Sequence, residues 1–288
     1  MFCIYFDRVS IPASQDTILM FTQFLSRSFT SPLSIKNYLN GVKFLHVILG
    51  HEFSFSSDLD FRLLFNGIQR QLNHVPKRAC PITPVHLHLL AEAAASGSLL
   101  DQVCFSAGLL LFFVMARAGN VFHDRLDPSN GLRRKDLLFS DDKLFVKFRK
   151  TKTIQFGKRK LIIPISGNGS NICPVSACAR MIRRIPGNPT DPLFFSYRHK
   201  RVSPVTKDVF LSHIRKLLQS AGVDNFGDFT CHSFRRGGAS WFFRVGVPGE
   251  LIQVFGDWAS DAYKLYLDIS MDTKLHFADY VASVINIK

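Results

Sequence analysis

The stretch that most constrains the fold of this 288-residue chain is an almost continuous apolar run from Phe105 to Ala116. A helix needs about 20 apolar residues to cross a bilayer, and this run is much shorter than that. A helix that is apolar on all sides is normally buried in the core of a protein. We therefore predict a buried helix over 99–116, enclosed by the rest of its domain.

Arg117 follows this run directly. Leaving a guanidinium unpaired at the end of a buried helix costs on the order of several kcal/mol. Three kinds of partner would remove this cost: a carboxylate, a set of backbone carbonyls, or a bound anion. The sequence leaves these three alternatives open.

The charge balance favours an anionic partner. The chain has 36 Lys and Arg against 22 Asp and Glu, a formal net charge of +14, with a pI near 9.7. Such a balance points to nucleic acid before membrane, although it does not distinguish DNA from RNA. The six cysteines lack paired spacing and Asp7 interrupts the N-terminal apolar stretch, so we expect a reducing, intracellular environment and no signal peptide.

The hydrophobic pattern predicts a helical N-terminal domain, a linker and a larger second domain. Three apolar stripes with helical spacing lie between residues 12 and 72, and prolines then interrupt the pattern from 76 to 84. We assign residues 1–75 to the first domain, 76–84 to a basic linker and 85–288 to the second domain. The stripes consist of Ile18, Leu19, Phe21, Phe24 and Leu25; of Ile35, Leu39, Val42, Phe44, Leu45 and Ile48; and of Phe61, Leu64, Phe65, Ile68 and Leu72.

The second domain begins with helices and changes to a strand pattern between residues 137 and 165. We expect a small antiparallel sheet there, followed by further helices, so that the fold as a whole is mainly α. One hairpin of this sheet carries seven cations and no acidic residue between Lys147 and Lys160. A charged surface is often only solvated, but uncompensated cations on one hairpin repel one another, which favours contact with phosphates.

A pair of polar residues near the C-terminal end indicates phosphate chemistry. Thr230 or Cys231 caps a predicted helix on which His232 and Arg235 are three positions apart and so share a face. An imidazole transfers protons near neutral pH, and a guanidinium offers a planar pair of donors to two phosphate oxygens. The pair suits reaction at a phosphate diester, although a helix start with a surface arginine accounts for the same letters equally well.

In sequence order, the chain presents an arginine after a buried helix, a lysine on a basic hairpin, the His-x-x-Arg pair and a helix with two tyrosines. This ordered set resembles the tyrosine recombinase (phage integrase) superfamily, and the resemblance covers nearly the whole chain. It implies a helical core-binding domain that clamps DNA and a catalytic domain that is mainly α with a small antiparallel β-sheet. The amino-acid sequences of residues 233–239 and 258–263 are most similar to those of the recombinases of eukaryotic mobile elements, the DIRS-like retrotransposons and cryptons.

The resemblance also implies roles for individual residues. Asp257 stands where the family usually has His or Trp, and this is a departure because a carboxylate accepts hydrogen bonds but does not donate them at neutral pH. The indole N–H of Trp258 is the proposed substitute. Tyr263 is expected to supply a ring to the core. The catalytic set is Arg117, Lys152 with Lys150 as the alternative, His232, Arg235, Asp257, and Tyr266 as the nucleophile.

The implied reaction is attack of Tyr266 on a DNA phosphodiester, which gives a 3′-phosphotyrosyl link and a free 5′-hydroxyl, with Lys152 as the general acid. One phosphodiester is exchanged for another, so no ATP is needed, and we expect no cofactor and no metal. The implied partner is double-stranded DNA, bound by a homo-tetramer in a eukaryotic nucleus, with no membrane contact. The other expected DNA contacts are Lys147, Arg149, Lys150, Lys158, Arg159, Lys160, Arg236, Lys77 and Arg78.

A predicted C-terminal helix over 273–285 would pack either on a neighbouring protomer or within its own domain. Two other functions remain open at this point. A type IB topoisomerase shares the Arg, Lys and Tyr chemistry, although the Arg-Arg-Gly-Gly-Ala wording from residue 235 argues against it. A catalytically silent DNA-binding protein derived from a mobile element is favoured by Asp257.

Overall fold

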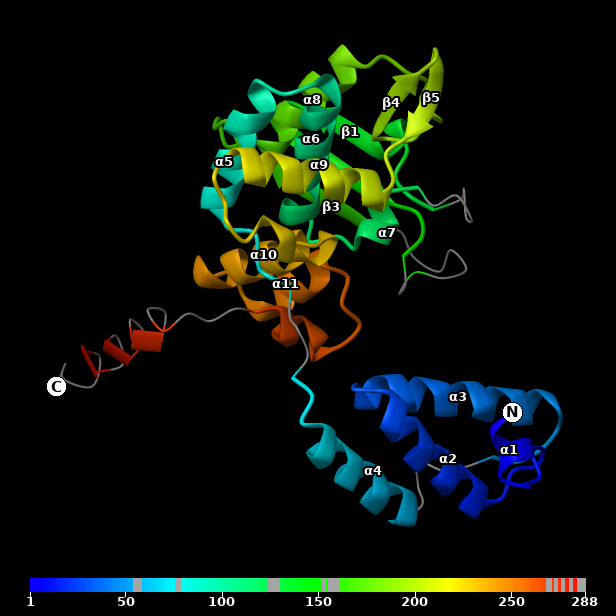
Figure 1. The fold of residues 1–288 in the computed structure, drawn as a ribbon. Coiled ribbons are helices and arrows are strands. Elements are labelled where there is room, and N and C mark those ends of the chain that lie inside the picture. Colours follow the sequence, from blue (N-terminus) through cyan, green and yellow to red (C-terminus); the bar gives the residue numbers. More distant parts are fainter. Residues whose placement is uncertain are drawn as a thin grey trace. The chain divides into compact units, whose positions relative to one another are not determined.

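The computed structural model describes residues 1–53, 59–75, 79–123, 130–151, 154 and 161–267, and single positions between 271 and 283. The chain divides into two compact units, Met1–Arg78 and Ala79–Lys288 (Figure 1). This division lies within the linker that the sequence predicts. We describe each unit by itself.

The N-terminal unit is helical, with α1 at Phe2–Tyr5, α2 at Gln15–Ser28, α3 at Pro32–Ile48 and α4 at Leu59–Leu72. Its core contains residues of each of the three predicted stripes: Ile18, Leu25, Ile35, Leu39, Phe61 and Ile68.

The second stripe is only partly correct. On α3 the inward face runs through Ile35, Leu39, Val42 and His46, at spacings of four, three and four residues. His46 is buried and accepts the Ala13 N–H at 2.9 Å through Nε2. Three residues assigned to this stripe lie off that face and are exposed: Phe44, Leu45 and Ile48. The polar His46 holds an inward position because its ring nitrogens find backbone partners.

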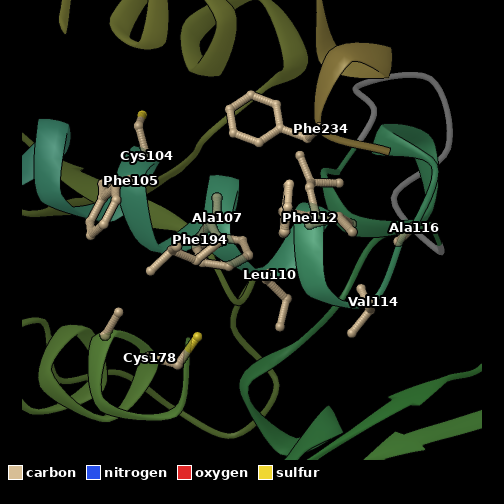
Figure 2. Close-up of a cluster of buried hydrophobic side chains, with 14 of the residues drawn as sticks. Cys104, Phe105, Ala107, Leu110, Phe112, Val114, Ala116, Cys178, Phe194 and Phe234 are labelled. Atoms are coloured by element: carbon tan, nitrogen blue, oxygen red, sulfur yellow. The ribbon is translucent and has the colours of Figure 1, made fainter. Parts of the chain in front are cut away.

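In the second unit the buried helix is confirmed as α6, Leu99–Phe113. Ser98 caps it by accepting the Asp101 N–H at 3.2 Å. Four helices contact it: α5 at Pro84–Ala95, α8 at Pro174–Arg184, α9 at Lys207–Ser220 and α10 at Cys231–Arg244. Figure 2 shows the α6 side chains between Phe234 of α10 and Cys178 of α8. The helix ends earlier than predicted because the chain turns at Met115, whose φ of 48° is left-handed.

The predicted antiparallel sheet is also confirmed. It has the order β1-β2-β3, with β1 at Leu137–Ser140, β2 at Lys143–Phe148 and β3 at Leu161–Ser166. Every second residue of β3 is buried, as expected for a strand with one face on a core. A further ribbon of β4, Phe195–Arg198, and β5, Arg201–Pro204, was not predicted. Its two turn residues, His199 and Lys200, both have positive φ, which a sequence without Gly or Asn there does not indicate.

Three short elements complete the main body: α7 at Ala118–Val121, η1 at Arg134–Asp136 and η2 at Phe226–Asp228. After α10 come α11 at Gly249–Phe255 and η3 at Asp261–Tyr266, a 3-10 helix where we predicted a longer α-helix. Most of the predicted helix over 273–285 lies outside the described residues. Among the described helices, none combines the length and the apolar character that a membrane span requires. The fold is thus mainly α with small antiparallel sheets, as predicted.

Candidate active site

Helix α10 begins as the sequence predicts and carries the His-x-x-Arg pair. The Thr230 hydroxyl accepts the His232 N–H at 3.2 Å, and Ser233 Oγ accepts the Thr230 N–H at 2.9 Å. These reciprocal bonds satisfy donors at the helix start. His232 is exposed, whereas Arg235 is only 1% exposed. Arg235 is therefore not a surface arginine, and the alternative explanation of this motif is excluded.

Two glycines explain how α10 comes so close to its neighbours. A Cβ on Gly237 would lie 1.9 Å from the carbonyl oxygen of Ile82, and a Cβ on Gly238 would lie 2.1 Å from that of Phe112. The Ile82 N–H also donates to the Ser233 carbonyl at 3.0 Å. Glycine permits this close approach of protein backbone, which holds the helix against the start of its unit and against α6.

Arg235 lies between a carbonyl and two aromatic rings. Its Nη1 donates to the Met115 carbonyl, and its guanidinium carbon lies 3.6 Å from the centroid of the Trp258 ring and 5.4 Å from that of Tyr266. Its Nε and Nη2 are buried without a hydrogen-bond partner. Burial lowers the pKa of Arg235, and the positive charge of Arg117 lowers it further. Buried unpaired donors on a cation are costly, and a bound anion would satisfy them.

Arg117 follows the left-handed Met115 by two residues and lies close enough to Arg235 to lower its pKa. Its Nη1 is buried and has no hydrogen-bond partner, and the salt bridges between described residues do not include it. Of the three partners that the sequence left open, the carboxylate and the carbonyls are not used within the described part of the chain. The arrangement matches the third alternative, a bound anion.

His232 is an exposed residue, but the surrounding protein still removes part of the hydration of its ring, which lowers its pKa, and the charges of Arg235, Arg117 and Lys207 lower it further. Its imidazole is therefore neutral near pH 7, and it can accept a proton or a hydrogen bond beside the two guanidiniums.

Lys207, at the start of α9, was missed by our sequence analysis. A methyl group on Gly119 would lie 3.6 Å from Lys207 Nζ, which places this ammonium next to the residues that follow Arg117. A lysine after Thr206, the N-cap of α9, resembles any other surface lysine in sequence, because its position depends on how α9 packs on α6.

The two tyrosines of η3 occupy different environments. Tyr263 is 8% exposed and belongs to a small core with Met115, Ile252 and Trp258, as predicted. Its hydroxyl abuts Gly249, where an added Cβ would lie 2.3 Å away. Tyr266 is half-buried, and its ring lies beside Arg235 and 5.3 Å from the Trp258 ring. The geometry places Tyr266, and not Tyr263, with the guanidinium.

Asp257 is at the C-terminal end of α11. Its N–H bonds to the Val254 carbonyl at 3.2 Å and the Trp258 N–H bonds to the Gln253 carbonyl at 3.1 Å, a Schellman motif in which Asp257 is left-handed with φ 54°. The Asp257 carboxylate is buried and accepts the Thr151 hydroxyl at 2.6 Å.

The next residue, Trp258, is 6% exposed and stacks on Arg235, and its indole Nε1 has no hydrogen-bond partner. The indole N–H expected to replace the family donor is thus buried, unpaired and within the site.

The basic hairpin is described only in part. Lys152, Lys158, Arg159 and Lys160 lie outside the described residues, as do Lys77 and Arg78 of the linker. Lys150 is exposed and Lys147 is half-exposed.

Two of the expected DNA contacts, Arg149 and Arg236, bond to other described residues. Arg149 has a counter-ion from outside the hairpin, since its Nη2 lies 3.0 Å from Asp136 Oδ2. Our expectation that every hairpin cation is uncompensated is therefore wrong for this residue. Arg236 donates to the Ala79 carbonyl at 3.1 Å. Whether these residues also contact DNA stays a prediction. In the described regions no group of three His, Cys, Asp or Glu residues is placed to hold a metal ion.

Known proteins resemble this chain in sequence pattern and in fold. A model of the phage integrase family matches residues 125–270, just over half of the chain. Arg117 lies before the matched segment. No curated protein sequence matches.

Three solved structures share the fold at low sequence identity. The XerH site-specific recombinase in its post-cleavage complex has a TM-score of 0.60 and 15% identity, over 92% of this chain and 71% of that one. The Tn1549 transposon integrase with a circular intermediate DNA has a TM-score of 0.59 and 14% identity, over 92% of this chain and 84% of that one. XerA recombinase has a TM-score of 0.53 and 18% identity, over 91% of this chain and 97% of that one. Together with the family match, the fold shows that this chain belongs to the phage integrase family, the tyrosine recombinases that break and rejoin DNA.

Proposed function

We propose that this chain is a site-specific DNA recombinase in which Tyr266 cleaves one strand and remains joined to its 3′-phosphate. The observation that carries this proposal is the meeting of Arg117 and Arg235 beside Tyr266, with buried guanidinium nitrogens that have no hydrogen-bond partner. A phosphate placed between these groups would receive the missing hydrogen bonds. It would also lie within reach of the tyrosine oxygen.

The chemistry follows from this arrangement. A phenol with a pKa of about 10 attacks poorly until it is deprotonated, and two neighbouring cations favour the phenolate. The transition state gathers negative charge on the non-bridging phosphate oxygens, where preorganised guanidiniums have their largest effect. The neutral His232 serves as a proton or hydrogen-bond acceptor. The Trp258 indole N–H donates to the phosphate in place of the usual family residue. Lys152, or Lys150, protonates the leaving 5′-oxygen.

The reaction is reversed when the 5′-hydroxyl of a second strand attacks the phosphotyrosyl link. Because a phosphodiester is present at the start and at the end, no ATP is consumed. The same groups serve in both directions, since the 5′-oxygen of the second strand attacks from the position that the leaving 5′-oxygen of the first strand held.

The exposed cations of the second unit supply sequence-independent affinity. Lys147 and Lys150 are at least partly exposed on the hairpin, and the net charge of +14 favours a duplex partner. The remaining proposed contacts are Arg149, Lys158, Arg159, Lys160, Arg236, Lys77 and Arg78.

The active form we propose is a homo-tetramer on double-stranded DNA. Truncation after Ser270 should leave a monomer on DNA when the complexes are sized by light scattering. An unfolded product would indicate instead that the C-terminal segment belongs to the core of its own domain.

The proposed origin is a eukaryotic mobile element of the DIRS-like or crypton kind, with action in the nucleus. Support for this assignment comes from the amino-acid sequence around the His-x-x-Arg pair and Trp258. The measurement that tests this origin is whether the protein cleaves and rejoins the terminal sequences of such an element in a cell that carries it.

A suicide duplex, nicked so that rejoining is blocked, tests the function. The parent protein should accumulate a covalent adduct. Tyr266→Phe should bind the same duplex and form none, because only the attacking oxygen is lost. Tyr263→Phe is the matched control and should retain the adduct.

The second candidate is a silent DNA-binding protein, which the acidic residue at position 257 favours. It would bind the suicide duplex without any adduct in the parent protein. An adduct that survives in Tyr266→Phe and disappears in Tyr263→Phe would move the nucleophile to Tyr263.

A further inference from the structure

The carboxylate of Asp257 is held in a way that a phosphate contact does not explain. It is 5% exposed, and its residue has a left-handed backbone that glycine adopts more easily. A buried carboxylate on an unfavourable backbone is costly in two respects, and a strong local partner must offset this cost. The structure provides one, the Thr151 hydroxyl at 2.6 Å.

Thr151 is the residue between the two candidate lysines, Lys150 and Lys152. Its hydroxyl donates to Asp257 and accepts the Ile154 N–H at 3.0 Å, while its own N–H donates to the Ile154 carbonyl at 3.2 Å. Two hydrogen bonds therefore join Thr151 to Ile154. Ile154 is 1% exposed and belongs to the main core, so these bonds tie Thr151 to a packed residue.

The side chain of Thr151 is in turn held by the carboxylate of Asp257. The two residues are 106 positions apart in sequence, and their bond joins the end of the β2 region to the end of α11, directly before Trp258. The Trp258 ring in turn stacks on Arg235. The bond thus connects Thr151, which lies between the two candidate lysines in sequence, to the part of the site that holds the Arg235 guanidinium.

We propose that Asp257 is a positioning residue that anchors Thr151, and so places the candidate general-acid lysine next to Thr151 in the chain at the leaving oxygen. This inference rests on the proposed function. In the step concerned, the Tyr266 oxygen forms a bond to phosphorus and the bond from phosphorus to the 5′-oxygen breaks. The electron pair of that bond goes to the 5′-oxygen, which takes a proton from the lysine ammonium.

A substrate with sulfur at the 5′-bridging position separates this role from others. A thiol has a pKa of about 8.5, so a thiolate leaves without protonation and the general acid becomes unnecessary. A residue that only positions the acid should therefore matter for the oxygen substrate and not for the sulfur substrate. A residue that supports the fold, or that acts on the non-bridging oxygens, should matter for both.

The test uses the full chain and a suicide duplex built on the sequence that the parent protein protects from nuclease. Thr151→Val should lower single-turnover cleavage of the oxygen substrate by about 10- to 100-fold, because a displacement near 1 Å costs about that much. With the sulfur substrate the loss should shrink to about twofold, and duplex affinity should stay within about twofold. Thr151→Ser keeps the hydroxyl and should restore the parent rate.

Asp257→Asn provides a second route to the same result if Thr151→Val folds poorly. Its neutral amide accepts the Thr151 hydroxyl more weakly, so we expect an intermediate loss on the oxygen substrate and the same recovery with sulfur. Equal losses on both substrates, or parent rates in both variants, would overturn the positioning role while leaving the recombinase function intact. A parent protein that cleaves neither substrate would overturn the recombinase function itself, and this inference with it.

Discussion

Two regions of the site are held in different ways. Helix α10 is fixed by backbone contacts at Gly237 and Gly238, which leave no room for a single added carbon. Thr151, beyond the end of β2, is held by its hydrogen bond to Asp257 and by two hydrogen bonds to the buried Ile154. The groups on α10 must face developing charge without rearrangement, which rigid packing provides. The lysine next to Thr151 must deliver one proton, and hydrogen bonds to Thr151 are enough to place the backbone at that residue.

The strongest way to break this contrast is to remove the cations of the rigid region. Arg117→Ala and Arg235→Ala should each lower cleavage per bound complex by about 100-fold or more, because stabilisation of the transition-state charge is lost. Duplex affinity should fall by less than about fivefold, since many other cations hold the DNA backbone. Single-turnover cleavage and a binding titration on the same duplex measure the two effects.

Arg183→Ala provides the control for this pair, because Arg183 is an exposed arginine of α8 outside the site. Arg183→Ala should change neither the cleavage per bound complex nor the duplex affinity by more than about twofold. If affinity and rate fell in the same proportion in the site variants, the two arginines would be phosphate clamps and not groups of the transition state.

A smaller effect is expected when the packing of α10 is disturbed. Gly237→Ala places a carbon 1.9 Å from the Ile82 carbonyl oxygen, so the backbone must shift. Overpacking of this kind typically costs about 1–3 kcal/mol, and we expect a loss of that size in the free energy of unfolding from denaturant titration.

Gly227→Ala is the matched control for Gly237→Ala, because nothing lies within 4 Å of its added carbon. It should change the free energy of unfolding by no more than about 0.5 kcal/mol. Parent-like stability in Gly237→Ala would show that α10 can move away from Ile82 at little cost, and that the region is less rigid than its packing indicates.

The smallest effect concerns the protonation of His232. Its pKa is lowered from the ordinary value near 6.5, so the ring is neutral at pH 7 and the site gains a further positive charge only at lower pH. Cleavage per bound complex should therefore be flat from pH 8 to about 6.5 and fall below that. The unfolded chain takes up the proton first, so stability also decreases as pH falls through about 6.5.

Lys207→Ala sharpens this measurement. It removes one of the charges that lower the pKa of His232, so the acid side of the pH–rate profile should move upward by a fraction of a pH unit. An NMR titration of the His232 ring, compared between parent and variant, reports the same shift directly. A midpoint at or above 6.5 in the parent protein would contradict the electrostatic description of this site.

Local pattern was sufficient for much of the fold. The apolar run predicted α6, alternation predicted the β2–β3 pairing, and the Thr230 cap predicted the start of α10, because each depends on residues only a few positions apart. The choice of Tyr266 over Tyr263 came instead from the family resemblance and stays a prediction, with the Tyr266 ring beside Arg235 and Tyr263 in a small core. The outward face of α3 was misjudged because an inward histidine is invisible to a hydrophobic pattern.

The sequence by itself determined which residue types are available: two arginines, a histidine, neighbouring lysines and a tyrosine in family order, on a mainly helical chain. Only the tertiary structure decided how they are used. It left Arg117 and Arg235 without a salt bridge within the described residues, paired Arg149 with Asp136, brought Lys207 near the site, and joined Asp257 to Thr151. The physical reason is distance along the chain. Caps and periodicity are set by near neighbours, whereas a contact between residues 106 positions apart exists only after the core has packed.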